Sequence, residues 1–213
     1  MRPLADLIDP DDAGPEDVRQ LLARAVNPVE VFRSDRPRGE RALLRVQSPT
    51  RAPLGAVAYH LGGLVFDYGW LRLLAAGSPR FSRDLAAWNG PVDAPRLAGA
   101  LLVGDDVSGG FFAVDEGAFG GAAGAVHYFA PDTEGWDDLD IDYRGLLDWA
   151  CNGDLDGWYG EARWPEWEAE VLGLKLDQAL DFDPPLSEEA ESRRRSRIGV
   201  EVAWQRAAEA LRG

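Results

Sequence analysis

Residues 104–149 read GDDVSGGFFAVDEGAFGGAAGAVHYFAPDTEGWDDLDIDYRGLLDW and carry the densest pattern in the chain. Two short apolar runs, 111–114 and 126–130, are rich in aromatic and β-branched residues and are bounded by Gly, Asp and Pro, as buried strands usually are. The glycine-rich segment between them cannot hold a regular element, so the runs are predicted to pair as an antiparallel hairpin. An acidic loop then leads to a helix that Asp142 caps and Asn152-Gly153 ends.

The rest of the chain adds helices and further strands around this unit. A helix is predicted over 15–25, a strand from Val29, a mixed helical and extended segment over 40–46, and a hairpin in which 55–60 and 64–74 flank Gly62-Gly63. A short helix capped by Ser82 and a strand over 97–103 follow. Beyond Gly153 the spacing favours helices, the last of which carries Val202 and Leu211 on one side.

This order predicts an α+β fold with a largely antiparallel sheet flanked by helices. We expect one domain over residues 1–186 and a C-terminal helical extension over 187–213, where Ser187 offers a cap and 192–197 form a basic SRRRSR patch. The extension is expected to dock on the core or on another chain, so the protein is expected to be a monomer or a homodimer.

Charge and cysteine content restrict the partners and the compartment. The 213-residue chain has a formal net charge of −15, which disfavours binding to nucleic acid or to anionic membranes and favours a basic protein partner. Cys151 is the only cysteine, so no intrachain disulfide can form. The first residues lack the apolar core of a signal peptide, and the apolar region 55–77 is interrupted by polar residues. A cytoplasmic location is therefore expected.

Three stretches carry a resemblance to a known family: GGFFAVDEG…HYFAPDTEGWDDLDIDYRGLLDWACNGDL over 109–155, GGLVFDYGWLRLLAAG over 62–77 and NPVEV over 27–31. Over about residues 3–185 the chain resembles the uncharacterised bacterial domain of unknown function 2625 family. More distantly, the strand pair, the VHYFAPD strand and the closing LLDWA helix resemble the SUKH superfamily of yeast cell-wall-synthesis regulators and bacterial toxin-immunity proteins. This resemblance implies a SUKH-like binding scaffold and no catalytic residues, and the longer C-terminal region departs from it.

No motif for catalysis or metal binding is recognisable. The acidic residues of 132–142 do not follow the spacing of a calcium loop, and a solvated loop, a protein-binding patch and a metal site are the alternatives for them. His60 and His127 are the only histidines, and neither lies in a metal-binding or hydrolase motif. Cys151 lies near the C-terminal end of its predicted helix, where the dipole disfavours a thiolate. We expect no catalytic residue, metal or cofactor.

The sequence therefore favours a non-enzymatic, protein-binding scaffold, and inhibition of a basic toxin in the manner of an immunity protein is its most specific form. Trp136 would be an interface anchor ringed by acids. The predicted partner-binding residues are Asp105, Asp106, Asp132, Glu134, Trp136, Asp137 and Asp138. One alternative is a small hydrolase or carbohydrate-active enzyme that uses carboxylates and His127. Another is a regulatory dimer formed through residues 187–213.

Overall fold

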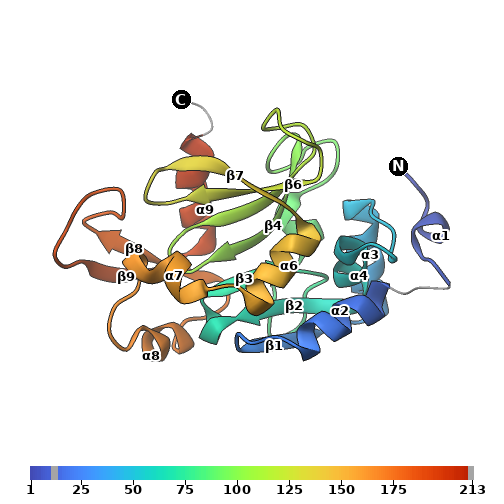
Figure 1. Cartoon of the computed structure of the whole chain (residues 1–213). Coiled ribbons are helices and arrows are strands. Elements are labelled where there is room, and N and C mark those ends of the chain that lie inside the picture. The colour runs from blue at the N-terminus through green and yellow to red at the C-terminus, as the bar shows by residue number, and fades with distance from the viewer. Residues whose placement is uncertain (11–13, 211–213) are drawn as a thin grey trace.

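The structure is a computed structural model that describes residues 1–10 and 14–210. Within these residues, seven antiparallel strands form one sheet in the order of the sequence, from β1 to β7, and each strand pairs with its neighbours along the chain (Figure 1). The strands are β1 (Val29–Arg33), β2 (Leu61–Phe66), β3 (Leu71–Leu74), β4 (Ala100–Asp106), β5 (Phe111–Asp115), β6 (Ala125–Ala130) and β7 (Gly135–Asp142). A separate hairpin joins β8 (Gln178–Asp183) to β9 (Arg194–Gly199).

Cross-strand pairing aligns two rows of residues that run across the whole sheet. Successive residues of a strand point to opposite faces, so the two rows occupy opposite faces. The first row is Glu30, Val65, Arg72, Asp105, Phe111, Phe129 and Trp136. The second row is Val31, Leu64, Leu73, Gly104, Phe112, Tyr128 and Asp137.

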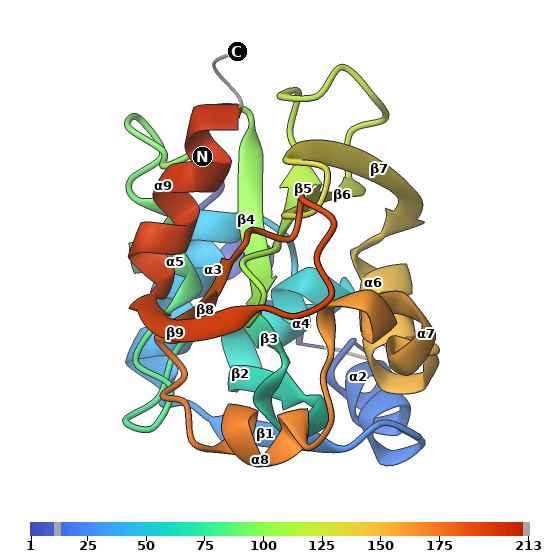
Figure 2. The same ribbon diagram turned by 90° about the vertical axis from the view of Figure 1, so that its left-hand side faces the viewer.

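Different elements cover the two faces (Figure 2). The second row lies under α4 (Pro53–His60) and α6 (Tyr143–Asn152), with α2 (Gly14–Ala23) against both helices. Trp149 of α6 packs on Phe112, with ring centroids 5.9 Å apart. The first row faces β8, β9 and α9 (Val200–Ala210), and Trp204 of α9 meets Phe111 with 5.2 Å between the ring centroids. The sheet is therefore the middle layer of three.

Aromatic rings also attach the segment after α6 to one end of the sheet. A second buried cluster joins Trp70 and Val107 to α7 (Leu155–Tyr159) and α8 (Trp167–Leu172). The Arg163 guanidinium lies 4.7 Å from the Trp70 ring and 4.0 Å from the Trp167 ring, and it pairs with the buried Asp67. Cation–π contacts of this kind hold a charged side chain inside an aromatic cluster.

The central unit forms as the sequence predicts. Strands β5 and β6 pair as an antiparallel hairpin, and the long glycine-rich segment joins them. Asp142 caps α6 by accepting a hydrogen bond from the amide of Gly145 at 2.8 Å, and Asp154 caps α7 through Gly157 in the same way. The expected α+β class and the largely antiparallel sheet are confirmed.

Several local predictions are wrong. Residues 55–60, expected to be a strand, belong to α4, because Pro53 starts a helix and Gly55 allows its backbone to approach the carbonyl of Pro49. The hairpin is instead β2 with β3, joined at Asp67–Gly69. Helix α3 (Arg36–Val46) is helical throughout 40–46, and Asp84 rather than Ser82 caps α5 (Leu85–Asn89).

The expected acidic loop is largely the edge strand β7. From Leu139 to Asp142 half-buried residues alternate with exposed aspartates, whereas Asp137 and Asp138 before them are both exposed and Trp136 is half-buried. Aspartate is uncommon in strands, and the segment was therefore predicted to be a loop. An exposed edge lined with carboxylates also resists pairing with other chains.

The C-terminal region is not wholly helical. Residues 187–199 form a loop and β9, and β9 pairs with β8 across the expected boundary at residue 186. Among residues 187–210, α9 is the one helix, and its buried side chains lie on the chain's own sheet: Val200, Ala203, Trp204 and Ala207. Leu211, expected on the same side, lies outside the described residues.

Replacing Trp204 with alanine should destabilise the protein by about 3–5 kcal/mol, because a buried tryptophan is lost against Phe111. Val202 on the same helix is 43% exposed, so Val202→Ala is the matched control and should change stability by no more than about 0.5 kcal/mol. Urea unfolding followed by circular dichroism measures both. Equal effects of the two substitutions would show that α9 is not docked on this sheet.

Candidate functional site

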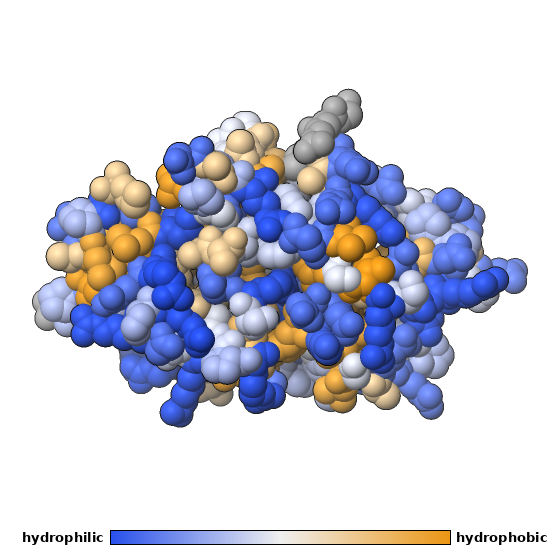
Figure 3. Space-filling model, turned by 180° about the vertical axis from the view of Figure 1, so that it is seen from behind, coloured by the Kyte–Doolittle hydropathy of each residue, from blue (hydrophilic) through white to orange (hydrophobic). Residues whose placement is uncertain are grey.

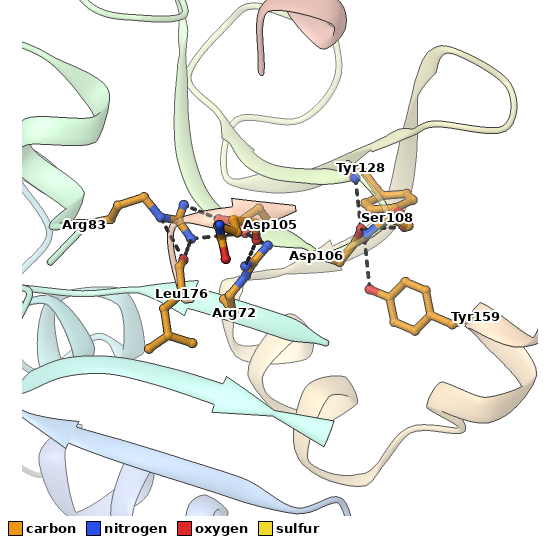
Figure 4. Close-up of polar contacts among 10 residues, drawn as sticks. Arg72, Arg83, Asp105, Asp106, Ser108, Tyr128, Tyr159 and Leu176 are labelled. Carbon is orange, nitrogen blue, oxygen red and sulfur yellow. Dashed lines mark hydrogen bonds and ion pairs between the residues drawn. The ribbon is translucent and has the colours of Figure 1, made fainter. Parts of the chain in front are cut away.

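The centre of the sheet holds a buried cluster of charges. Asp105 on β4 is paired with Arg72 on β3, with 2.6 Å between Nη2 and Oδ1, and with Arg83, whose two terminal nitrogens donate to both carboxylate oxygens (Figure 4). The side chains of Arg72 and Asp105 are each 1% exposed. The carbonyls of Gln178 and Leu176 accept hydrogen bonds from Arg72 and Arg83, and such bonds offset part of the cost of burying an ion pair.

Asp106 is the next residue, and its carboxylate points to the opposite face. Its Oδ1 accepts from the amides of Ser108 and Gly110 at 2.9 Å each and from the Ser108 hydroxyl at 2.6 Å. Its Oδ2 accepts from the hydroxyls of Tyr128 at 2.7 Å and Tyr159 at 3.3 Å (Figure 4). Burial raises the pKa of Asp106, although these hydrogen bonds act against the shift. Burial and then Asp106 raise the pKa of both tyrosines, which therefore remain hydrogen-bond donors.

Asp105 and Asp106 are therefore interior residues. Both were expected at a turn facing a protein partner, but each is 1% exposed. The prediction assigned both carboxylates to one surface because the two residues are adjacent in the sequence. In an extended strand, however, adjacent side chains point to opposite faces of the sheet. Neither carboxylate belongs to a surface that a partner could reach.

The hydroxyl donors around Asp106 form the floor of a wide cleft. The cleft has a volume of about 1090 Å³, and Ser108, Tyr128 and Tyr159 line its base. Its walls are the turn after β6, the helix α7 and the loop that joins β8 to β9, of which residues 186–191 and 193 line the space. Two of the predicted partner-binding residues, Asp132 and Asp137, lie in this cleft.

Acidic and aromatic groups dominate the cleft. One lining side chain is basic, Arg193, and two of its nitrogens donate to carbonyls of its own loop. Trp158 is 45% exposed, and its ring lies 5.8 Å from that of Tyr128 and 5.4 Å from that of Trp149. The lining carboxylates are Asp132, Asp137, Glu161, Glu188, Glu189 and Glu191.

The other predicted site residues lie elsewhere. Glu134 lines a neighbouring hollow of about 300 Å³, and the Ser187 hydroxyl lies 3.5 Å from its carboxylate. Trp136 is half-buried against Phe119 and Phe129, so it is not the exposed anchor that was expected. Its row is on the face opposite to Tyr128 and Asp137, and Asp138 pairs with His127 on that same opposite face.

His127 lies away from the cleft. Its side chain is 5% exposed and stacks on Phe119 with 4.2 Å between ring centroids. Nε2 is 3.9 Å from a carboxylate oxygen of Asp138, and Nδ1 has no hydrogen-bond partner. His127 is not among the residues that line the cleft. The alternative of an enzyme that uses His127 stays a prediction.

Sequence reasoning missed most of the cleft. Trp158, Glu161 and the loop over 186–191 come from segments far from 132–137 in the chain, and only the tertiary fold brings them together. The run SEEAE at 187–191 was an available signal, because a second acidic cluster in a negative chain marks a solvated or partner-facing segment.

The fold and the site define an α+β protein with an acidic, aromatic cleft on one side of an antiparallel sheet. Residues 4–204 match the family described as "Protein of unknown function DUF2625", and the chain belongs to that family. It is 36% identical to the uncharacterised protein YbfG of Escherichia coli (strain K12) over 208 residues, which cover 96% of this chain and 95% of that protein. It is 32% identical to an uncharacterised protein of Haemophilus influenzae over 212 residues, covering 96% and 93%.

No solved structure matches the chain, so the more distant resemblance to the SUKH superfamily stays a prediction. Among residues 1–10 and 14–210, no three His, Cys, Asp or Glu side chains are grouped in a way that could hold a metal ion. Over the same described ranges, none of the helices has the length and apolar character needed to cross a membrane.

Replacing Asp105 with asparagine should destabilise the protein by about 3–5 kcal/mol, because two buried guanidiniums lose their shared counter-charge. Asp181→Asn is the matched control, since its pair with Arg206 is partly solvated and should contribute about 1 kcal/mol or less. Chemical denaturation at neutral pH compares the two. A loss for Asp105→Asn no larger than that of the control would contradict the assigned role.

The thiol of Cys151 should be unreactive in the folded protein. Burial, and then the charge of Asp148, raises the pKa of Cys151 to about 11, so the thiolate is scarce at pH 8. The native protein should react with Ellman's reagent at least about 100-fold more slowly than the protein in denaturing urea. Comparable rates in the two conditions would show an accessible thiolate and would reopen a nucleophilic role.

Proposed function

We propose that this protein is a non-enzymatic binding protein whose acidic, aromatic cleft holds a basic segment of a protein partner. The observation that carries the proposal is the lining of the cleft, in which six carboxylates and one arginine surround the exposed ring of Trp158. A lysine or arginine side chain that enters would meet carboxylates on several sides and aromatic faces at its stem.

Electrostatics and rigidity both favour such a partner. The net charge of −15 attracts a basic protein over a distance and increases the rate of encounter. The floor of the cleft is fixed, because Tyr128, Tyr159 and Ser108 all donate to the buried Asp106. A preorganised floor reduces the ordering cost of binding.

The most specific form of this proposal is inhibition of a basic toxin enzyme by occupation of its positively charged surface, in the manner of an immunity protein. An acidic inhibitor is well matched to an enzyme whose own substrate is anionic, because both ligands are attracted by the same positive surface. Nucleic acid is not an expected partner, since the lining carboxylates would repel its phosphates.

The proposal is tested with a fluorescein-labelled oligoarginine peptide and anisotropy at physiological ionic strength. The variant Asp132→Asn with Asp137→Asn and Glu161→Gln removes three cleft carboxylates and should weaken binding at least about tenfold. The matched control, Asp6→Asn with Asp93→Asn and Glu116→Gln, removes the same charge from exposed positions outside the cleft lining and should weaken it less than about threefold. Equal weakening by the two variants would show a general charge effect and would contradict a cleft-specific site.

The role of Trp158 has a separate test. Trp158→Ala should weaken the peptide at least about fivefold while leaving the salt dependence of binding unchanged, because no formal charge is removed. Trp158→Phe should retain part of the affinity. If both variants bind the peptide as the unmodified protein does, the aromatic wall takes no part in recognition.

Capture of partners from cell extract can then use the unmodified protein against the cleft variant and the control variant. The partner that the proposal requires is a basic protein that is retained by the unmodified and control proteins and lost with the cleft variant. Its release on raising the salt concentration would fit the same interaction.

A further inference from the structure

Another hollow lies at the other end of the sheet, on the face that carries Arg72 and Asp105. It is a groove of about 680 Å³ lined by residues of β1, β2 and the segment that runs from α8 into β8. Phe32 and Val65 contribute to the sheet side of the groove, and Val171, Leu174 and Leu176 to the opposite side. A concave, mainly apolar site of this size is typical of pockets for small molecules.

Arg72 supplies a polar group at the floor of this groove. Its residue is 1% exposed and lines the groove. Nη1 donates to the carbonyl of Gln178 at 2.5 Å and Nη2 lies 2.6 Å from Asp105, but the buried Nε–H has no hydrogen-bond partner. A buried donor without a partner is costly, and a ligand can relieve that cost.

The buried cluster around Arg72 contains more arginines than carboxylates. Two guanidiniums, those of Arg72 and Arg83, share the single carboxylate of Asp105. Asp106 points to the other face, where its carboxylate accepts hydrogen bonds from Ser108, Gly110 and Tyr128 and not from an arginine. Burial lowers the pKa of Arg72, and the neighbouring Arg83 acts in the same direction, while the charge of Asp105 opposes the shift.

The mouth of the groove adds another cation. Lys175, the single lysine of the chain, lines the groove and is exposed, and within the described residues it has no ion-pair partner. Arg80 lies there too but pairs with Glu30 at 2.8 Å. The outer surface seen from behind is mostly hydrophilic, with hydrophobic patches of limited extent (Figure 3). The charged residues that line the groove are thus three cations, Arg72, Arg80 and Lys175, and two carboxylates, Glu30 and Asp177, on a chain of net charge −15.

We propose that this groove is a binding site for a small amphipathic anion. The apolar body of the ligand would lie against Phe32 and Val65, and its carboxylate or phosphate would face Arg72 and Lys175. Such a ligand supplies the missing counter-charge and an acceptor for the unpartnered Nε–H of Arg72. The site is independent of the acidic cleft, because the two hollows share no lining residue.

The experiment compares two fluorescent probes of similar shape, the anionic 8-anilinonaphthalene-1-sulfonate and the uncharged N-phenyl-1-naphthylamine. The folded protein should bind one sulfonate probe per chain, at least about tenfold more tightly than the neutral probe. Octanoate and octyl phosphate should displace it, and octylamine should not. The relative strength of the two anions distinguishes a carboxylate ligand from a phosphate ligand. Equal affinity for both probes, or displacement by octylamine, would overturn the proposal.

Two variants in the groove lining and one control outside it locate the site without disturbing the core. Ser82→Trp places a large ring at an exposed position in the groove lining and should abolish probe binding, while Ser196→Trp, on the exposed strand β9, should leave it unchanged. Lys175→Met should weaken the sulfonate probe about threefold or more and leave the neutral probe unaffected. Unchanged sulfonate binding in Ser82→Trp would show that the probe binds elsewhere and would overturn the assignment.

Arg72→Met tests the floor directly, because Asp105 keeps Arg83 as a partner. In the folded variant the sulfonate probe should bind at least about tenfold more weakly, with little change for the neutral probe. Near-ultraviolet circular dichroism checks that the variant is folded. If it is not, Ser82→Trp and Lys175→Met decide the outcome alone. Binding of the oligoarginine peptide to the acidic cleft should be unaffected in all of these variants.

Discussion

A single buried carboxylate holding two arginines constrains the rest of this structure. Asp105 lies in the middle strand of the sheet, with Arg72 beside it and Arg83 reaching it from the segment before α5. The carbonyls of Leu176 and Gln178 accept hydrogen bonds from these arginines, and the segment leading into β8 is thereby fixed against the sheet. Buried charges require partners of this kind, so this cluster specifies where the C-terminal region docks.

The alternation of side chains along β4 then separates two kinds of surface. Asp105 lies on the face that β8 covers and pairs with Arg72, which lines the apolar groove, while Asp106 faces the tyrosines beneath the acidic cleft. A cationic ligand and an anionic ligand are thus suited to opposite faces of one rigid sheet. Each carboxylate is held by its own set of hydrogen-bond donors, and the donors to Asp105 are different residues from the donors to Asp106.

The sequence predicted the central hairpin, its following helix and the α+β class, because glycine, proline and capping aspartates act locally. The predictions from sequence were wrong for segments whose secondary structure depends on tertiary packing. Residues 55–60 carry apolar residues that suit a strand or a buried helix, and the close approach of Gly55 to Pro49 selects the helix. The edge strand β7 was not predicted because aspartates, which are uncommon in strands, make up half of its residues.

The candidate site was predicted only in part. Asp132 and Asp137 were placed on a partner-facing surface from their local sequence, and the structure puts both in the acidic cleft. Asp105 and Asp106 had the same composition around them, but their burial depends on Arg72, Tyr128 and Tyr159, which are distant in sequence. Trp158 and the loop over 186–191 could be joined to the cleft only by the fold.

The most direct measurement is a nuclear magnetic resonance titration of the isotopically labelled protein with the oligoarginine peptide. Each tryptophan indole N–H gives its own signal, so the eight tryptophans report on different parts of the fold. We expect the signals of the Trp158 indole and of the amides of residues 157–161 and 186–191 to shift first, while the signal of the buried Trp204 indole stays unchanged. Shifts spread evenly over all acidic surfaces, or concentrated around Trp136 and Asp138, would contradict this expectation.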